Sequence, residues 1–144
     1  MDLDTYWKTL IDRVYEQKEK LQGDEDIFYR LSCIYGETMV DGIEAYFERR
    51  YKEYDLDMAA LKLTGFANIA SDFDEARKVM FGDALLEESF ISSVVAKMLD
   101  ENTEMQSVLQ AIDIIYQRLI ERLEVLAEYK YQFGLRQGFY SEPA

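Results

Sequence analysis

Residues 105–133 read MQSVLQAIDIIYQRLIERLEVLAEYKYQF. The apolar residues of this stretch recur at intervals of three and four, which is the spacing of one face of an α-helix. They are Met105, Val108, Leu109, Ile112, Ile115, Tyr116, Leu119, Leu123, Leu126 and Ala127. The pattern predicts a helix from residue 104 to about residue 133, roughly 45 Å long at 1.5 Å per residue. We expect so long a helix to be the spine of the fold or to reach a second subunit, which would make the protein a homodimer.

The rest of the chain has the pattern of shorter helices separated by glycine, a residue at which helices commonly end. The predicted helices cover residues 4–22, 25–35, a segment carrying Met39 to Phe47, residues 58–66, a segment capped by Asp72 that carries Phe73 to Met80, and residues 84–99. No stretch shows the sustained two-residue alternation of a strand. The sequence therefore predicts an all-α fold, with a single compact domain of about six to seven helices over residues 1–138 and a short C-terminal tail over residues 139–144.

Acidic residues dominate the composition. The chain carries 29 Asp and Glu against 16 Lys and Arg, for a net charge of −13. A hydrophobic fraction of 49% and an aromatic fraction of 14% are too high for a disordered acidic tail, so the charge is expected on the outside of a folded body. Excess acid argues against nucleic acid or an anionic membrane as the direct ligand.

Several features favour a cytoplasmic location. The acidic N-terminus lacks the apolar core of a signal peptide, and no apolar run approaches the roughly 18 residues that a membrane span requires. The single cysteine, Cys33, allows no internal disulfide, which fits a reducing compartment.

The sequence also lacks the residues of most catalytic sites. It contains no histidine, which excludes Ser-His-Asp and Cys-His arrangements and every His-based zinc site. The glycine-rich phosphate loops and the calcium loop with its alternating acids are missing as well. Cys33 lies in an apolar run without a base to activate it, so it is expected to be a small buried hydrophobe. We therefore expect no enzyme activity, no metal and no cofactor.

The acid is concentrated in the middle of the chain. Residues 1–52 have a net charge of −4, residues 53–104 of −8 and residues 105–144 of −1. The middle segment is thus where a basic partner is expected to bind, through Asp55, Asp57, Asp72, Asp74, Glu75, Asp83, Glu87, Glu88, Asp100 and Glu101. Helix capping and solubility stay open as alternative roles for these acids. Acids in the first turn of a helix stabilise it by about 0.3–1 kcal/mol each, and surplus charge keeps a protein soluble.

Three segments carry a resemblance to a known family. The first segment is Asp41-Gly42-Ile43-Glu44-Ala45-Tyr46-Phe47, which keeps a glycine, the apolar residue after it and a Tyr-Phe pair. The second, Ala59 to Phe66, is an apolar helix with a glycine near its end. The third, Asp74 to Val79, matches the helix that follows in the family. The region of about residues 26–81 resembles a bacterial family of domains of unknown function that includes DNA-mimic proteins. The chain departs from the family's Asn-Gly-Gly-Phe-x-Gln-Tyr-Phe pattern, since the Asn and one glycine are missing and the Gln is displaced. The resemblance implies an all-α body that could dimerise and whose carboxylates would stand in for DNA phosphates.

Three functions are compatible with these features. The first is an acidic binding protein that occupies the basic surface of a DNA-binding regulator or nuclease as a DNA mimic, which would compete with DNA and weaken steeply with salt. The second is an immunity protein that neutralises a bacterial toxin, which would add a buried aromatic anchor and tolerate salt better. The third is a small enzyme or ligand sensor, which a deep pocket with a perturbed carboxylate would favour.

Overall fold

The computed structural model describes residues 1–100 and 103–143, and the elements in this part of the chain are helical. In chain order they are α1 (Leu3–Ile11), the π-helical turn η1 (Asp12–Glu16), α2 (Gly23–Arg50), the 3-10 turn η2 (Tyr51–Glu53), α3 (Tyr54–Leu63), α4 (Ala67–Phe81), α5 (Glu88–Leu99), the 3-10 turn η3 (Thr103–Met105) and α6 (Gln106–Arg136). The predicted all-α class and the long C-terminal helix are confirmed.

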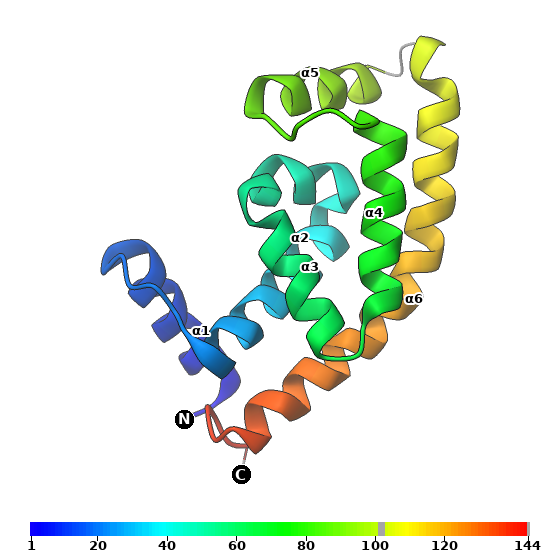
Figure 1. Ribbon diagram of the computed structural model, residues 1–144. Coiled ribbons are helices and arrows are strands. Elements are labelled where there is room, and N and C mark those ends of the chain that lie inside the picture. Colours follow the sequence, from blue (N-terminus) through cyan, green and yellow to red (C-terminus); the bar gives the residue numbers. More distant parts are fainter. Residues whose placement is uncertain (101–102, 144) are drawn as a thin grey trace.

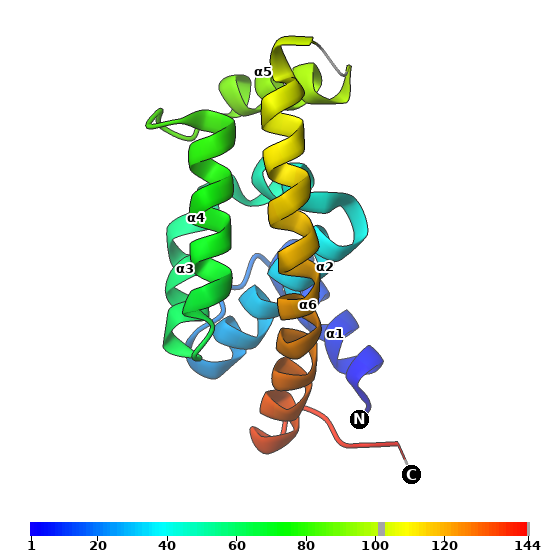
Figure 2. The same cartoon turned by 90° about the vertical axis from the view of Figure 1, so that its right-hand side faces the viewer.

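Helix α6 runs along the whole molecule, from α5 at one end to both chain termini at the other (Figure 1). Its buried residues include Ile112, Ile115, Leu119, Leu123 and Leu126, which belong to the apolar face that the sequence pattern predicted. Figure 2 shows α4 lying beside α6 along much of its length, while α2 packs against another side of α6. The helix is therefore the spine of the fold, and its stability comes mainly from this packing rather than from helix propensity.

Helix α2 is continuous through Gly36 but breaks at Gly42, so the prediction of two helices was right about a break and wrong about its position. The backbone of Gly42 has φ 94° and ψ 175°, which side chains of L-residues rarely tolerate. Just before the break, the Tyr116 hydroxyl of α6 lies 3.4 Å from the Thr38 carbonyl oxygen and 3.5 Å from that of Met39, and donates to them. Tyr116 thus helps to satisfy backbone acceptors where the helix is interrupted.

Several predicted helix starts and ends were wrong, including both ends of the helix predicted over residues 58–66, which the structure has as Tyr54–Leu63. Helix α4 begins at Ala67, so Asp72 lies in its interior and caps nothing. Helix α5 begins at Glu88 rather than at residue 84, because Gly82 ends α4 with a positive φ of 63° and Glu87 is extended. The first helix ends at Ile11 and continues only as η1, since Lys18 adopts a left-handed φ of 56° that sequence reasoning assigns to glycine.

The residues after Gly138 pack back on the N-terminus. The Tyr140 side chain is buried among Tyr6 and Phe28, and its hydroxyl donates to the Tyr131 carbonyl oxygen at 2.8 Å. The ring lies so close to Gly134 that a Cβ there would collide with it. A hydrogen bond of 2.8 Å from the Ser141 N–H to the Met1 carbonyl oxygen joins the two ends of the chain. Residues 139–141 are therefore part of the folded body.

An ion-paired cluster fixes α1 and η1 to the start of α2. Two Arg13 nitrogens donate to the Glu25 carboxylate at 2.8 Å each, and the Tyr6 hydroxyl donates to the same carboxylate at 2.6 Å. These bonds lower the pKa of Glu25 below its ordinary value of 4.5, and the bonds from Arg13 have the largest effect. The neighbouring Trp7 ring stacks on Tyr29 with 5.7 Å between centroids. As the only tryptophan, Trp7 reports whether α1 is docked.

We predict that acid releases α1 through Glu25. Because the folded-state pKa of Glu25 is lowered, its contribution to stability is fully present above about pH 4.5 and is lost as the pH falls through that lowered value. Trp7 fluorescence should therefore change at a pH below the ordinary Glu value. The control is Glu25→Gln, which should show a weaker acid transition and an already altered Trp7 signal at pH 7. Identical acid transitions in the two proteins would contradict the prediction.

Two glycines of α2 provide a matched test of the break. Gly42→Ala should destabilise the fold by about 1–3 kcal/mol, because alanine resists the positive φ. Gly36→Ala should instead stabilise it by about 0.5–1 kcal/mol, because Gly36 has ordinary helical geometry and a Cβ there meets no atom within 4 Å. Urea unfolding followed by circular dichroism measures both. Equal effects of the two substitutions would show that α2 does not break at Gly42.

Candidate protein-binding surface

The carboxylate of Asp57, one of the ten predicted partner-binding residues, is 0% exposed. Its Oδ2 accepts hydrogen bonds from the Tyr46 hydroxyl at 2.7 Å and from Arg50 Nε at 2.8 Å. Its Oδ1 accepts from Arg50 Nη2 at 2.8 Å and from Arg30 Nη1 at 3.1 Å. The three donors come from α2 and the carboxylate from α3, so this centre joins the two helices. Asp57 cannot contact a partner, and its assignment to the binding surface was wrong.

Asp72 is the second predicted partner-binding residue that is buried in the structure. It is 2% exposed and faces α6 from α4. Arg118 Nε donates to its Oδ1 at 2.8 Å, and Arg122 Nη1 lies 2.9 and 2.8 Å from its two oxygens. Arg118 also donates to the exposed Glu75 at 2.6 Å. Asp72 therefore ties α4 to α6, and charge reversal there would disrupt the fold before it tested any partner.

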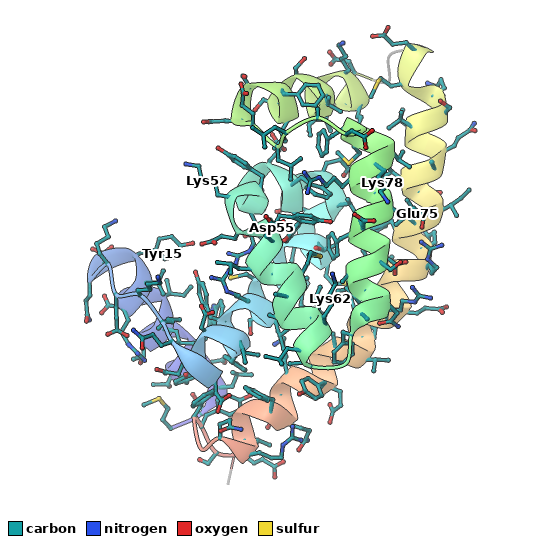
Figure 3. The ribbon with its side chains drawn as sticks, viewed as in Figure 1. Tyr15, Lys52, Asp55, Lys62, Glu75 and Lys78 are labelled. Atoms are coloured by element: carbon teal, nitrogen blue, oxygen red, sulfur yellow. The ribbon has the colours of Figure 1, made fainter. Side chains whose placement is uncertain are left out.

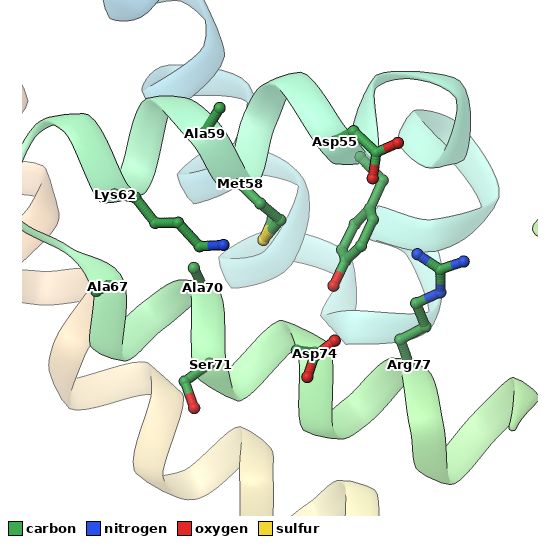
Figure 4. A pocket seen from close by; sticks show the side chains of 10 residues that line it. Asp55, Met58, Ala59, Lys62, Ala67, Ala70, Ser71, Asp74 and Arg77 are labelled. Atoms are coloured by element: carbon green, nitrogen blue, oxygen red, sulfur yellow. The ribbon is translucent and has the colours of Figure 1, made fainter. Parts of the chain in front are cut away.

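Asp55 and Asp74 are exposed on opposite sides of a groove between α3 and α4 (Figure 4), which has a volume of about 540 Å³. Lys62 and Arg77 line the same groove, and Lys78 pairs with Asp74 at 3.0 Å. Figure 3 shows side chains of both signs on these two helices, with Asp55 and Lys62 on α3 and Glu75 and Lys78 on α4. The groove thus carries charges of both signs and is not a negative face.

The remaining predicted residues are divided between two places. Asp83, Glu87 and Glu88 are exposed where the chain passes from α4 to α5, and they form no ion pair within the described residues. Asp100 is exposed at the opposite end of α5. Glu101 lies outside the described residues. The predicted middle segment is therefore not one surface: it contributes a small acidic corner, two internal ion-pair centres and a groove of mixed charge.

The outward side of α6 carries a more continuous set of carboxylates. Four exposed acids recur there at helical spacing, on the side opposite the buried leucines; we call them the α6 acidic face, namely Asp113, Glu121, Glu124 and Glu128. Among the residues that the structure describes, none of the four takes part in an ion pair. The exposed Ile114 and Val125 lie at one edge of this face, with exposed fractions of 66% and 63%. The four carboxylates span about 22 Å along the helix axis.

Sequence reasoning missed this face because it counted charge by segment. Residues 105–144 have a net charge of only −1, since Arg118 and Arg122 offset the acids. In the folded chain both arginines lie against α4 and are neutralised by Asp72 and Glu75. The signal that could have revealed the face is the helical period, which places the four acids opposite the apolar stripe and the arginines at its edge.

The described residues include no group of three or more Cys, Asp or Glu side chains placed to hold a metal ion. The Cys33 thiol is half-buried, and burial raises its pKa, which disfavours the reactive thiolate.

Within the described residues, no helix is both long and apolar enough to cross a membrane.

Comparison with protein-family models, with curated proteins and with solved structures found no match in any of the three. The resemblance to the family with DNA-mimic members accordingly stays a prediction from the sequence.

We predict that Asp57→Asn destabilises the protein by about 3–5 kcal/mol, because it leaves the buried Arg50 guanidinium without its counter-charge. Asp55→Asn, two residues earlier on the same helix but exposed, should cost less than about 1 kcal/mol. Both values follow from urea unfolding measured by circular dichroism. Similar losses for the two variants would mean that the buried centre does not hold α2 and α3 together.

Proposed function

We propose that this chain is a non-catalytic acidic protein that occupies a basic surface of a protein partner, and that it does so through the α6 acidic face. The observation that carries the proposal is the pairing of Arg118 and Arg122 with Asp72, which leaves Asp113, Glu121, Glu124 and Glu128 exposed without a neighbouring base on that face. A surface of one sign attracts a partner of the opposite sign and steers its approach.

The spacing of these carboxylates favours the broad form of the proposal over a close copy of DNA. One strand of B-DNA presents a phosphate about every 3.4 Å of helix axis. The α6 acidic face presents four carboxylates over about 22 Å, which is roughly half to two-thirds of that density. A DNA mimic would need further acids from a second element, such as Asp83, Glu87 and Glu88 near the start of α5.

The exposed Ile114 and Val125 support the alternative of an immunity protein. Apolar side chains at the edge of an acidic face provide contacts that would become buried in a salt-tolerant interface. The same face is a poor homodimer interface, because two copies would bring like charges together. The predicted homodimer would have to use another surface.

The test compares two triple variants that remove the same number of charges. Glu121→Gln, Glu124→Gln and Glu128→Gln neutralise the α6 acidic face, whereas Asp83→Asn, Glu87→Gln and Glu88→Gln neutralise the corner before α5. Proteins captured from source cells at 0.05 and 0.3 M salt are identified, purified and titrated against each variant. We expect the α6 variant to bind the purified partner about tenfold more weakly and the α5 variant to bind like the unmodified protein.

The outcomes separate the alternatives. Loss of binding in the α5 variant alone would move the site to that corner, and equal binding by all three proteins would overturn the proposal. Competition with duplex DNA for the purified partner, together with a steep loss of affinity in salt, would identify a DNA mimic. Binding that persists at 0.3 M salt without competition by DNA would identify the immunity function.

A further inference from the structure

A small pocket lies where α1, α2 and α6 meet, apart from the α6 acidic face. Its volume is about 260 Å³, below the roughly 300–1,000 Å³ that is usual for drug-sized ligands. The apolar part of its wall is formed by Leu3, Trp7, Phe28 and the open backbone at Gly36. The polar part consists of three side chains only, Asp4, Ser32 and Lys130. An apolar cavity with a few convergent polar groups is the usual form of a small-molecule site.

Lys130 is the unusual group in this pocket. Its side chain is half-buried, and the ammonium nitrogen lies 5.8 Å from the centroid of the Phe28 ring and 5.4 Å from that of Tyr35. Within the described residues no carboxylate forms an ion pair with it. Burial alone acts on its pKa and lowers it, because no neighbouring carboxylate compensates for lost water. Among the described residues, the Phe28 and Tyr35 rings are the groups that compensate for this charge.

Ser32 supplies a second group without a partner. The residue is 9% exposed, and its hydroxyl oxygen has no hydrogen-bond partner among the described residues. Buried hydroxyl groups are nearly always hydrogen-bonded, and Ser32 lines the same pocket as Lys130, so its unpartnered hydroxyl indicates a missing acceptor or donor there. Lys130 belongs to α6 and Ser32 to α2, so a single ligand group between the two helices would contact both side chains.

We propose that this pocket binds a small monocarboxylate with an apolar body, whose carboxylate pairs with Lys130 and accepts a hydrogen bond from Ser32. The apolar body would lie against Trp7 and Phe28. An ammonium and a hydroxyl together satisfy a carboxylate with charge-assisted hydrogen bonds. The exposed Asp4 at the rim opposes a second negative charge, which favours a monocarboxylate over a dianion such as phosphate. This site is independent of the function proposed above.

The experiment follows Trp7 fluorescence while the full chain is titrated with 3-phenylpropionate at 0.15 M salt. Parallel titrations use the neutral 3-phenylpropanol and inorganic phosphate. We expect saturable binding of the acid, with the alcohol and phosphate at least about tenfold weaker, because the alcohol carries no charge to pair with Lys130 and a phosphate dianion is repelled by Asp4 more strongly than a monocarboxylate is. Equal affinity for the acid and the alcohol, or no saturable binding of the acid, would overturn the proposal.

Four variants locate the binding. Lys130→Met keeps the apolar stem and removes a poorly compensated charge, so it should fold at least as stably and bind the acid about tenfold more weakly. Ser32→Ala should also fold normally and bind more weakly. Gly36→Leu fills the pocket from α2 without altering Lys130 and should abolish binding, since a Cβ there meets open space. Lys62→Met makes the same charge change at an exposed lysine and should bind like the unmodified protein. Unchanged affinity of a folded Lys130→Met protein would refute the site.

Discussion

The burial of two carboxylates, Asp57 and Asp72, is the constraint on which the rest of the molecule depends. An ionised carboxylate inside a protein is strongly unfavourable unless it is paired and hydrogen-bonded. Asp57 meets that requirement only when α2 brings Arg50, Arg30 and Tyr46 around it, and Asp72 only when α6 brings Arg118 and Arg122. These centres therefore fix α3 to α2 and α4 to α6, with a geometry that apolar packing alone would leave less defined.

The same constraint shapes the surface. Arginine suits these sites because its planar guanidinium donates several hydrogen bonds to one carboxylate. An arginine that pairs with a buried carboxylate no longer offsets the charge of an exposed acid. The two arginines of α6 are the clearest example, because their pairing with α4 leaves the outward side of that helix acidic. The interior ion pairs and the proposed binding face are thus two consequences of one arrangement.

The end of the molecule that holds both termini is built differently. Its core is aromatic, with Tyr6, Phe28, Phe133 and Tyr140 buried together, and α1 is held by the cluster around Glu25. Aromatic side chains bury large areas and pack in offset or edge-to-face arrangements. The pocket beside Lys130 lies in this region, where α1, α2 and α6 meet.

Much of the fold follows from the sequence alone. The apolar period of residues 105–133 determined a long buried helix, and the absence of any two-residue alternation determined the all-α class, because both are local patterns. The sequence indicated a break near Gly42. It did not indicate the end of the first helix, since Lys18 adopts a conformation that no local rule assigns to lysine. The net charge likewise follows from the sequence, whereas the positions of the exposed charges on the surface do not. Asp57 and Asp55 look alike in sequence, as do Asp72 and Asp74, yet one of each pair is buried and the other exposed. Only the tertiary structure decided this, because burial of a carboxylate depends on which distant arginines the packing of helices brings within hydrogen-bonding distance.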